Sequence, residues 1–211
     1  MQTAKTIKFI ALAGVDGSGK STQVEPLMEQ LLRDGHKVAY FHAIEFSLAN
    51  RLNRLWKKEK EFVPGKEEAV TQASLLSLLS REKFLFIDFI RFQFWRRHLR
   101  IEGYNYILSD RSFYDSLINI EYLNLDKNSS LVRFGLWWLN LFLPRADKVF
   151  FFDLTAEDIM TRSRVPEQGE QYLREKLTLF RVKKENWHLK SIDATETKED
   201  ILSILITSIK S

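Results

Sequence analysis

The stretch GVDGSGKST at residues 14–22 constrains the fold more than any other part of this chain. Three of the chain's eight glycines fall within six positions, and a lysine and two hydroxyl residues follow them. The spacing matches G-x-x-x-x-G-K-[ST], in which glycines let successive backbone N–H groups point into one concavity. An apolar run precedes the stretch at 7–13 and a helical pattern follows at 21–35. The sequence therefore predicts a strand, a phosphate-binding loop (a P-loop) and a helix, in that order.

The residues of this loop have predicted roles in binding a nucleoside triphosphate. Lys20 adds a point charge at the β and γ phosphates, and the hydroxyl of Ser21 is a candidate ligand for Mg²⁺. The alternative is an ordinary glycine turn beside a chance lysine, which does not account for the flanking strand and helix. The residues predicted to contact the nucleotide are Gly14, Val15, Asp16, Gly17, Ser18, Gly19, Lys20, Ser21 and Thr22.

The composition narrows the classes of function. Lys and Arg number 32 against 28 Asp and Glu, and the formal charge of +4 suits a small anionic ligand but falls short of a nucleic-acid-binding signature. The absence of cysteine excludes disulfides and thiolate nucleophiles. No repeat or linker divides the chain, and no apolar stretch approaches the ~20 residues that cross a bilayer. We therefore expect a single cytoplasmic domain over residues 1–211, with no nucleic-acid partner.

Five short apolar runs predict strands that are buried on both faces, and helical patterns between them predict an α/β fold with a parallel sheet. Residues 46–102 are expected to form two or more helices with a break near 63–68. The predicted strands span 7–13, 36–43, 104–110, 148–154 and 189–194. The apolar residues expected to face inward from the helices at 21–35 and 198–210 are Val24, Leu27, Met28, Leu31, Leu32, Ile201, Leu202, Ile204, Leu205 and Ile209.

The ends of the predicted strands distinguish between classes of P-loop protein. A GTPase would need an Asn-Lys-x-Asp motif after a later strand, and the chain contains no such tetrapeptide. A hydrolysing ATPase usually carries two consecutive acidic residues at a strand end. The candidate strand ends here read ILSDRS and FFFDLT, each with one aspartate. This pattern favours phosphoryl transfer to an acceptor over hydrolysis.

Four segments, GVDGSGKST, SDRSFYDS, FFDLTAEDIMTRSR and SIDAT, follow one another in an order and at intervals that resemble thymidylate kinase and its close P-loop relatives. The resemblance covers nearly the whole chain. It implies a P-loop NTPase fold, with a five-stranded parallel sheet flanked by helices and a short helical lid at about 160–178. It also implies ATP and Mg²⁺ as cofactors, a nucleoside monophosphate as acceptor with dTMP as the expected one, and a homodimer.

The same resemblance implies catalytic roles for individual residues, which are Asp16, Lys20, Arg111, Arg162 and Arg164. Asp110 is expected to help Ser21 position Mg²⁺. Arg111 follows a central strand at the edge where open α/β sheets bind ligands, so its guanidinium can bind a phosphate with two hydrogen bonds. The alternative for Arg111 is a structural ion pair with Asp110 or a neighbour. For Arg162 and Arg164, which we assign to the lid, the alternative is a solvated basic surface.

The acceptor side departs from the family pattern. The second strand leads into HAIEFSLANR, and the long helix reads FLFIDFIRFQFW, so the usual arginine loop and Asp-Arg pair are absent. Asp88 is roughly in place, and Arg51 or Arg91 would supply the missing contact. The predicted acceptor-binding residues are Arg51, Asp88, Arg91, Arg111 and Tyr114. Two alternatives stay open: a kinase for another acceptor, such as a deoxynucleoside or small metabolite, and a non-catalytic ATP-binding switch or scaffold.

Two aromatic-rich runs, at 84–95 and 134–144, raise a further question. Contiguous apolar helix faces are usually buried, so we expect these runs to lie in the core or in a helix–helix dimer interface. A wide apolar acceptor pocket and a contact with a membrane surface are the alternatives.

Overall fold

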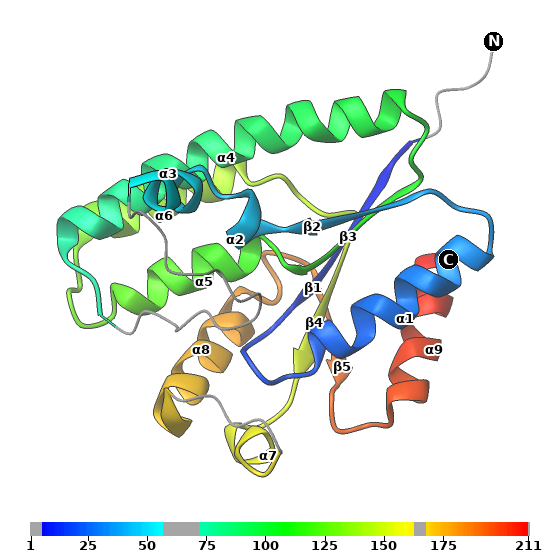
Figure 1. Ribbon diagram of the computed structural model, residues 1–211. Helices are drawn as coiled ribbons and strands as arrows, with labels where there is room; N and C mark the ends of the chain where they lie inside the picture. The colour runs from blue at the N-terminus through cyan, green and yellow to red at the C-terminus, as the bar shows by residue number, and fades with distance from the viewer. Residues whose placement is uncertain (1–5, 57–71, 163–167, 211) are drawn as a thin grey trace.

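The computed structural model describes residues 6–56, 72–162 and 168–210, and its strands form one parallel five-stranded sheet (Figure 1). The order across the sheet is β2-β3-β1-β4-β5, and every neighbouring pair is parallel. The predicted fold class and all five predicted strands are confirmed, with ends that shift by no more than two residues. The strands are β1 (Lys8–Ala13), β2 (Val38–His42), β3 (Tyr106–Arg111), β4 (Lys148–Asp153) and β5 (Leu189–Asp193).

Helices cover both faces of this sheet. Figure 1 shows α1 and α9 together on one side and α4, α5, α6 and α8 on the other. The predicted break near 63–68 lies outside the described residues. The helices are α1 (Lys20–Arg33), α2 (Ala43–Phe46), α3 (Leu48–Trp56), α4 (Leu75–Ile101), α5 (Phe113–Leu123), α6 (Ser130–Phe142), α7 (Ala156–Met160), α8 (Gly169–Lys183) and α9 (Lys198–Lys210).

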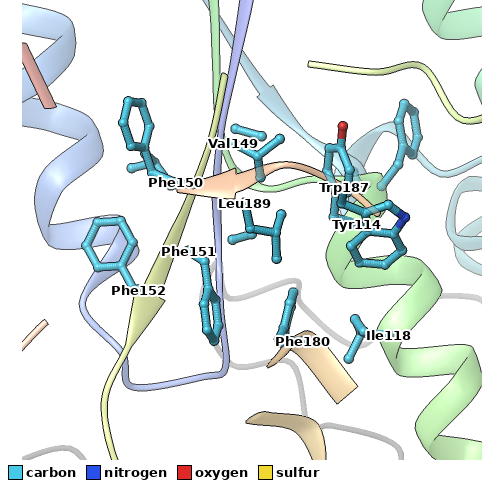
Figure 2. Packing of buried hydrophobic residues seen from close by; sticks show 14 of the residues in the cluster. Tyr114, Ile118, Val149, Phe150, Phe151, Phe152, Phe180, Trp187 and Leu189 are labelled. Atoms are coloured by element: carbon cyan, nitrogen blue, oxygen red, sulfur yellow. The ribbon is translucent and has the colours of Figure 1, made fainter. Parts of the chain in front are cut away.

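Strand β4 shows why the apolar runs are nearly continuous. Phe150, Phe151 and Phe152 are all fully buried, and they alternate between the two faces of the sheet (Figure 2). Phe151 stacks on Phe180 of α8, with ring centroids 5.2 Å apart. Because helices cover both faces, each position along the strand needs an apolar side chain. The prediction of strands buried on both faces is therefore confirmed for the central strands β1, β3 and β4. It is wrong for the edge strands β2 and β5, which carry exposed residues such as Tyr40 and Lys190.

The helices α1 and α9 bury narrower stripes than the sequence predicts. Leu27 and Leu31 of α1 and Leu205 of α9 are fully buried. Leu32 is 49% exposed and Ile204 is 40% exposed, so the prediction that these two face inward is wrong. Each lies beside a buried residue on the helix, and a step of one residue turns the side chain by about 100° toward solvent.

The two aromatic runs have different environments. In α4, Phe89 and Phe92 are buried, and Phe92 packs against Phe9 of β1 with ring centroids 5.0 Å apart. In α6, Phe134 is 63% exposed and Trp137 is 58% exposed. The expectation of burial in the core or in a dimer interface is met by core burial at the buried positions of the first run. Most of the second run lies outside the core, so for that run only the dimer-interface part of the expectation stays a prediction. Among the helices the structure describes, none has the length and apolarity needed to cross a membrane.

Candidate active site

The P-loop leaves β1 and turns into α1 through backbone conformations that glycine allows. Gly14 has a φ of +147°, and a β-carbon there would lie 3.1 Å from the Ser18 hydroxyl and 3.2 Å from the Phe152 carbonyl oxygen. Gly19 precedes α1 with a φ of +100°. L-amino acids with side chains rarely adopt these angles, so the glycine spacing of the sequence has a direct steric cause.

Lys20 begins α1 and turns its side chain back across the loop. Its Nζ donates to the carbonyl oxygens of Gly14 at 2.8 Å and Val15 at 2.7 Å. Burial lowers the pKa of the ammonium, and the carboxylates of Asp115 and Asp16 oppose that shift. The side chain thus carries its charge inside the loop whose backbone N–H groups are typical phosphate ligands.

The two predicted metal ligands lie together. Ser21 Oγ donates to Asp110 Oδ2 at 2.7 Å, which joins the start of α1 to the end of β3. The other oxygen, Asp110 Oδ1, accepts a hydrogen bond from the Tyr40 hydroxyl of β2 at 2.6 Å. Tyr40 was not among the predicted site residues. This interaction connects β2, β3 and α1 at the carboxyl edge of the sheet.

The donor set fits Mg²⁺, which prefers oxygen ligands and keeps several waters. Ser21 offers an alcohol and Asp110 a carboxylate. Within the described ranges, no group of three or more His, Asp or Glu side chains could hold a metal ion by itself. A magnesium ion here would therefore depend on phosphate oxygens and water for the rest of its coordination.

Asp16 and Arg111 form an ion pair at the same edge. Arg111 Nη2 donates to Asp16 Oδ1 at 2.9 Å, and the Tyr172 hydroxyl of α8 donates to Oδ2 at 3.4 Å. Burial alone would raise the pKa of Asp16, but the charges of Lys20, Arg111 and Lys176 outweigh it and hold the pKa below its usual value. Both members of the pair are partly exposed, so a ligand can reach them from solvent.

Arg162 follows α7 and contacts two loops of the site. Its guanidinium donates to the carbonyl oxygens of Gly17 in the P-loop at 2.9 Å and Ala194 after β5 at 2.5 Å. Arg162 is partly exposed, and both of these contacts are to backbone of the site, which favours the predicted role over a purely solvated basic surface. Arg164 lies outside the described residues.

The predicted acceptor residues separate into different groups. Asp88 accepts from the backbone N–H of Leu48 at 3.1 Å and pairs with Arg91, while Arg91 also donates to the Phe46 carbonyl oxygen at 2.9 Å. These two side chains hold the segment after β2 against α4.

Arg51 instead lines a pocket of about 350 Å³ at the carboxyl end of β2. The pocket is lined by Tyr40, Phe41, His42, Glu45, Phe46, Arg51 and Trp95.

The assignment of Tyr114 to the acceptor site is wrong. Its side chain is 1% exposed, and its ring packs against Trp187 with centroids 5.1 Å apart (Figure 2). The phenolic oxygen accepts from the backbone N–H of Ala146 at 3.1 Å. Tyr114 lies on the core side of α5. Its side chain therefore packs in the protein interior and does not contact a substrate.

Sequence reasoning missed three further polar residues of this region. Asp115 accepts from the backbone N–H of Gly14 at 3.3 Å and forms a capping box with Ser112 at the start of α5. The spacing Ser-x-x-Asp is a recognised signal for such a cap. Tyr172 and Lys176 lie four residues apart on α8, and that spacing indicated a shared helix face. Nothing in the sequence indicated that this face points to the P-loop.

Comparisons with known proteins bear on the fold and on the sequence resemblance. No family model matches the chain. Its sequence is 24% identical over 194 residues to a probable thymidylate kinase from Methanosphaera stadtmanae, covering 90% of this chain and 91% of that protein. Its structure resembles a deoxyadenosine kinase from M. mycoides that was solved with the products dCMP and a flexible dCDP bound. The TM-score is 0.53 and the identity 16%, over 96% of this chain and 98% of the other.

These similarities confirm two predictions. The likeness to a solved kinase confirms the predicted α/β fold, with its parallel sheet flanked by helices. The sequence match confirms the resemblance to thymidylate kinase over nearly the whole chain. Both similar proteins are phosphotransferases, which agrees with the enzyme class that the strand ends indicated.

Proposed function

We propose that this chain, a kinase of the thymidylate kinase-like type, transfers a phosphoryl group from ATP to a nucleoside monophosphate, with dTMP as the expected acceptor. The observation that carries the proposal is the convergence of three features at the carboxyl edge of the sheet. They are the buried Lys20 within the P-loop, the contact between Ser21 and Asp110, and the ion pair of Asp16 with Arg111. Phosphoryl transfer depends mainly on such positioning and charge.

On the donor side, we assign the triphosphate to residues 14–22, with Lys20 at the β and γ phosphates. Ser21 and Asp110 would hold Mg²⁺, which neutralises phosphate charge when bound. Arg162 contacts the P-loop carbonyl of Gly17, so its guanidinium is close enough to the loop to add positive charge there. Positive groups that are fixed before the reaction stabilise charge on the transferring phosphoryl group.

We further propose a single domain over residues 1–211, in which residues 160–178 form a lid. Arg162 and Arg164 follow α7 and would lie on this lid, where they can exclude water and bring charge to the site. The expected setting is the cytoplasm, and the expected partners are free nucleotides, with no role for nucleic acid.

On the acceptor side, Arg111 is the proposed ligand of the acceptor phosphate, and Asp16 fixes its guanidinium through the 2.9 Å ion pair. The pocket after β2 lies next to the end of β3, because Tyr40 of its lining donates to Asp110 and His42 of its lining is the sheet partner of Arg111. Its aromatic walls, Phe46 and Trp95, suit a planar base, and Arg51 supplies one cation.

One observation favours a second candidate, a deoxynucleoside as acceptor. Asp88 and Arg91 are engaged with backbone groups, and the pocket contains the carboxylate of Glu45. A carboxylate beside the acceptor disfavours the dianion of a nucleoside monophosphate and accepts a hydrogen bond from a neutral alcohol. The solved structure that this chain resembles is named a deoxyadenosine kinase.

We also propose that the chain forms a homodimer through the exposed apolar face of α4 and α6. Phe94 on α4 and Phe134, Trp137 and Leu141 on α6 are all more than half exposed. The two helices pack against each other, and large apolar side chains left exposed on neighbouring helices typically mark an interaction site. Sedimentation velocity should give a dimer for the natural chain and a monomer for Trp137→Glu. A natural chain that is monomeric at micromolar concentration would contradict the proposal.

The proposed activity is tested by measuring ADP formation with ATP and Mg²⁺ against a panel of acceptors. The panel comprises dTMP, the other nucleoside monophosphates, deoxynucleosides and a reaction without acceptor. Turnover that requires dTMP supports the leading proposal, and turnover that requires a deoxynucleoside supports the second candidate. Tight ATP binding without acceptor-dependent ADP would overturn both and favour the nucleotide-binding switch or scaffold.

A further inference from the structure

The inner face of α8 carries a buried lysine that points toward the P-loop. Lys176 is 8% exposed, and its Nζ donates to the hydroxyl of Tyr172, one helical turn away, at 2.6 Å. The ammonium lies over the ring of Tyr172, 4.5 Å from the centroid, and 5.6 Å from the ring centroid of Tyr122 on α5. A desolvated cation is stabilised by ring faces at such distances. The ammonium is therefore held between Tyr172 of α8 and Tyr122 of α5.

Tyr172 connects this lysine to the ion pair of the site. Its hydroxyl lies 3.4 Å from Asp16 Oδ2, and Asp16 Oδ1 accepts from Arg111 at 2.9 Å. An ammonium can only donate, so the Tyr172 oxygen accepts from Lys176 and its hydrogen points toward Asp16. The hydrogen bonds thus run in one direction, from Lys176 through Tyr172 to Asp16.

The surroundings of Lys176 contain charges of both signs. Asp16 of the P-loop and Asp115 of α5 face it, as do Lys20 of α1 and Arg111 of β3, besides the two tyrosines that contact it. Burial lowers the pKa of Lys176 to about 8, the two carboxylates oppose that shift, and the two cations reinforce it. Phosphate groups bound beside these residues would add negative charge and favour the protonated form.

We propose that Lys176 is a positioning residue of the phosphoryl-transfer site, which orients Asp16 through Tyr172 from the side opposite Arg111. The inference rests on the proposed function and extends it to a residue outside the P-loop, the Asp-Arg pair and the lid arginines. A neutral amine has a lone pair that competes with Asp16 for the Tyr172 hydrogen. Loss of the Lys176 proton therefore weakens the hydrogen bond from Tyr172 to Asp16.

The test compares Lys176→Met, Lys176→Arg and Tyr172→Phe with the natural chain, and it uses Lys83→Met, a change at an exposed lysine of α4, as the matched control. We expect Lys176→Met to lower kcat by about tenfold with less than about a twofold change in the KM for ATP, because the group acts on Asp16 rather than on the triphosphate. The thermal midpoint should stay unchanged or rise, because removal of a buried charge relieves its desolvation cost.

The pH profile separates positioning from a structural role. In the natural chain, kcat/KM for the acceptor and calorimetric affinity for the acceptor alone should fall as pH rises through about 8. Lys176→Arg keeps its charge, so both quantities should hold to higher pH. Tyr172→Phe should reproduce the Lys176→Met profile, since either change interrupts the same hydrogen bonds.

Two results would overturn the inference. One is a Lys176→Met protein with the kcat and pH profile of the Lys83→Met control. The other is a loss of activity that merely follows a fall in thermal midpoint. Failure of the proposed function is distinct, because the natural chain would then form no acceptor-dependent ADP. Acceptor affinity against pH, measured without ATP, would still report on Lys176.

Discussion

The proposed donor and acceptor sides of the site are built in different ways. On the donor side, side chains from separate elements meet one another or the loop itself: Lys20 contacts loop carbonyls, and Ser21 of α1 contacts Asp110 of β3. On the acceptor side, Asp88 and Arg91 contact backbone groups of the segment that follows β2. The first arrangement presents charge to a ligand, whereas the second fixes the shape of a pocket.

This difference shows how much of phosphate binding and of acceptor selection a short sequence motif can encode. Phosphate binding uses backbone N–H groups and one lysine, so nine consecutive residues carry nearly all of it. The proposed acceptor pocket is lined by side chains from β2, α2, α3 and α4, which the fold alone brings together. Changes on the donor side should therefore abolish activity, and changes on the acceptor side should alter specificity or stability.

The largest expected effect is on the donor side, for Lys20→Ala. We expect kcat to fall roughly a thousandfold, because the change removes a fixed positive charge at the transferring phosphoryl group. Steady-state kinetics would measure it, and circular dichroism would check that the fold is retained. Normal turnover in the Lys20→Ala variant would contradict a catalytic role for the P-loop.

On the donor side, the two arginines that follow α7, Arg162 and Arg164, should differ in their effects on kcat and on ATP affinity. Arg164→Ala should lower kcat about tenfold with little change in ATP affinity, as expected for a charge that acts in the transition state. Arg162→Ala should weaken ATP binding as well, because Arg162 also holds the carbonyl oxygens of Gly17 and Ala194. Equal kcat and Kd values for the two variants would show that they share one role. An unchanged kcat for Arg164→Ala would move the transition-state role to Arg162 or to Arg174, an arginine of α8 that pairs with Glu157 and Glu170.

On the acceptor side, Arg51 and Arg91 form a matched pair. Arg51→Met should raise the acceptor KM about fivefold and leave the thermal midpoint unchanged, since Arg51 lines the pocket. Arg91→Met should lower stability by about 2 kcal/mol, because it leaves the buried carboxylate of Asp88 without its charged partner. The reverse result, with Arg91 governing KM and Arg51 governing stability, would contradict the division described above.

The smallest expected effect concerns Tyr114. Tyr114→Phe removes the hydroxyl that accepts from Ala146 and should cost about 1 kcal/mol in free energy of unfolding. Acceptor KM and kcat should stay within about twofold of the natural chain. Chemical denaturation and the kinetic assay measure the two quantities. A large rise in acceptor KM would restore Tyr114 to the acceptor site.

The sequence predicted the sheet well because strands buried on both faces leave unmistakable apolar runs, such as KVFFFD in β4. It also indicated Asp16, Ser21, Asp110 and Arg111, which the structure brings together at one edge. It failed where a role depends on side-chain direction. Tyr114 turns into the core, Trp137 turns outward, and Lys176 turns toward a loop more than 150 residues away in sequence. Spacing along a helix predicts which residues share a face, but tertiary packing decides whether that face contacts the core, the solvent or a loop of the site.

The most direct measurement follows the γ-phosphoryl group of labelled ATP in a single turnover with Mg²⁺ and dTMP. Phosphoryl transfer predicts that the label appears on dTDP at the rate at which ATP disappears, and that Lys20→Ala prevents it. Label that appears on an added deoxynucleoside in place of dTMP would support the second acceptor. Label that stays on tightly bound ATP, or appears only as inorganic phosphate, would contradict the assignment of this site to phosphoryl transfer.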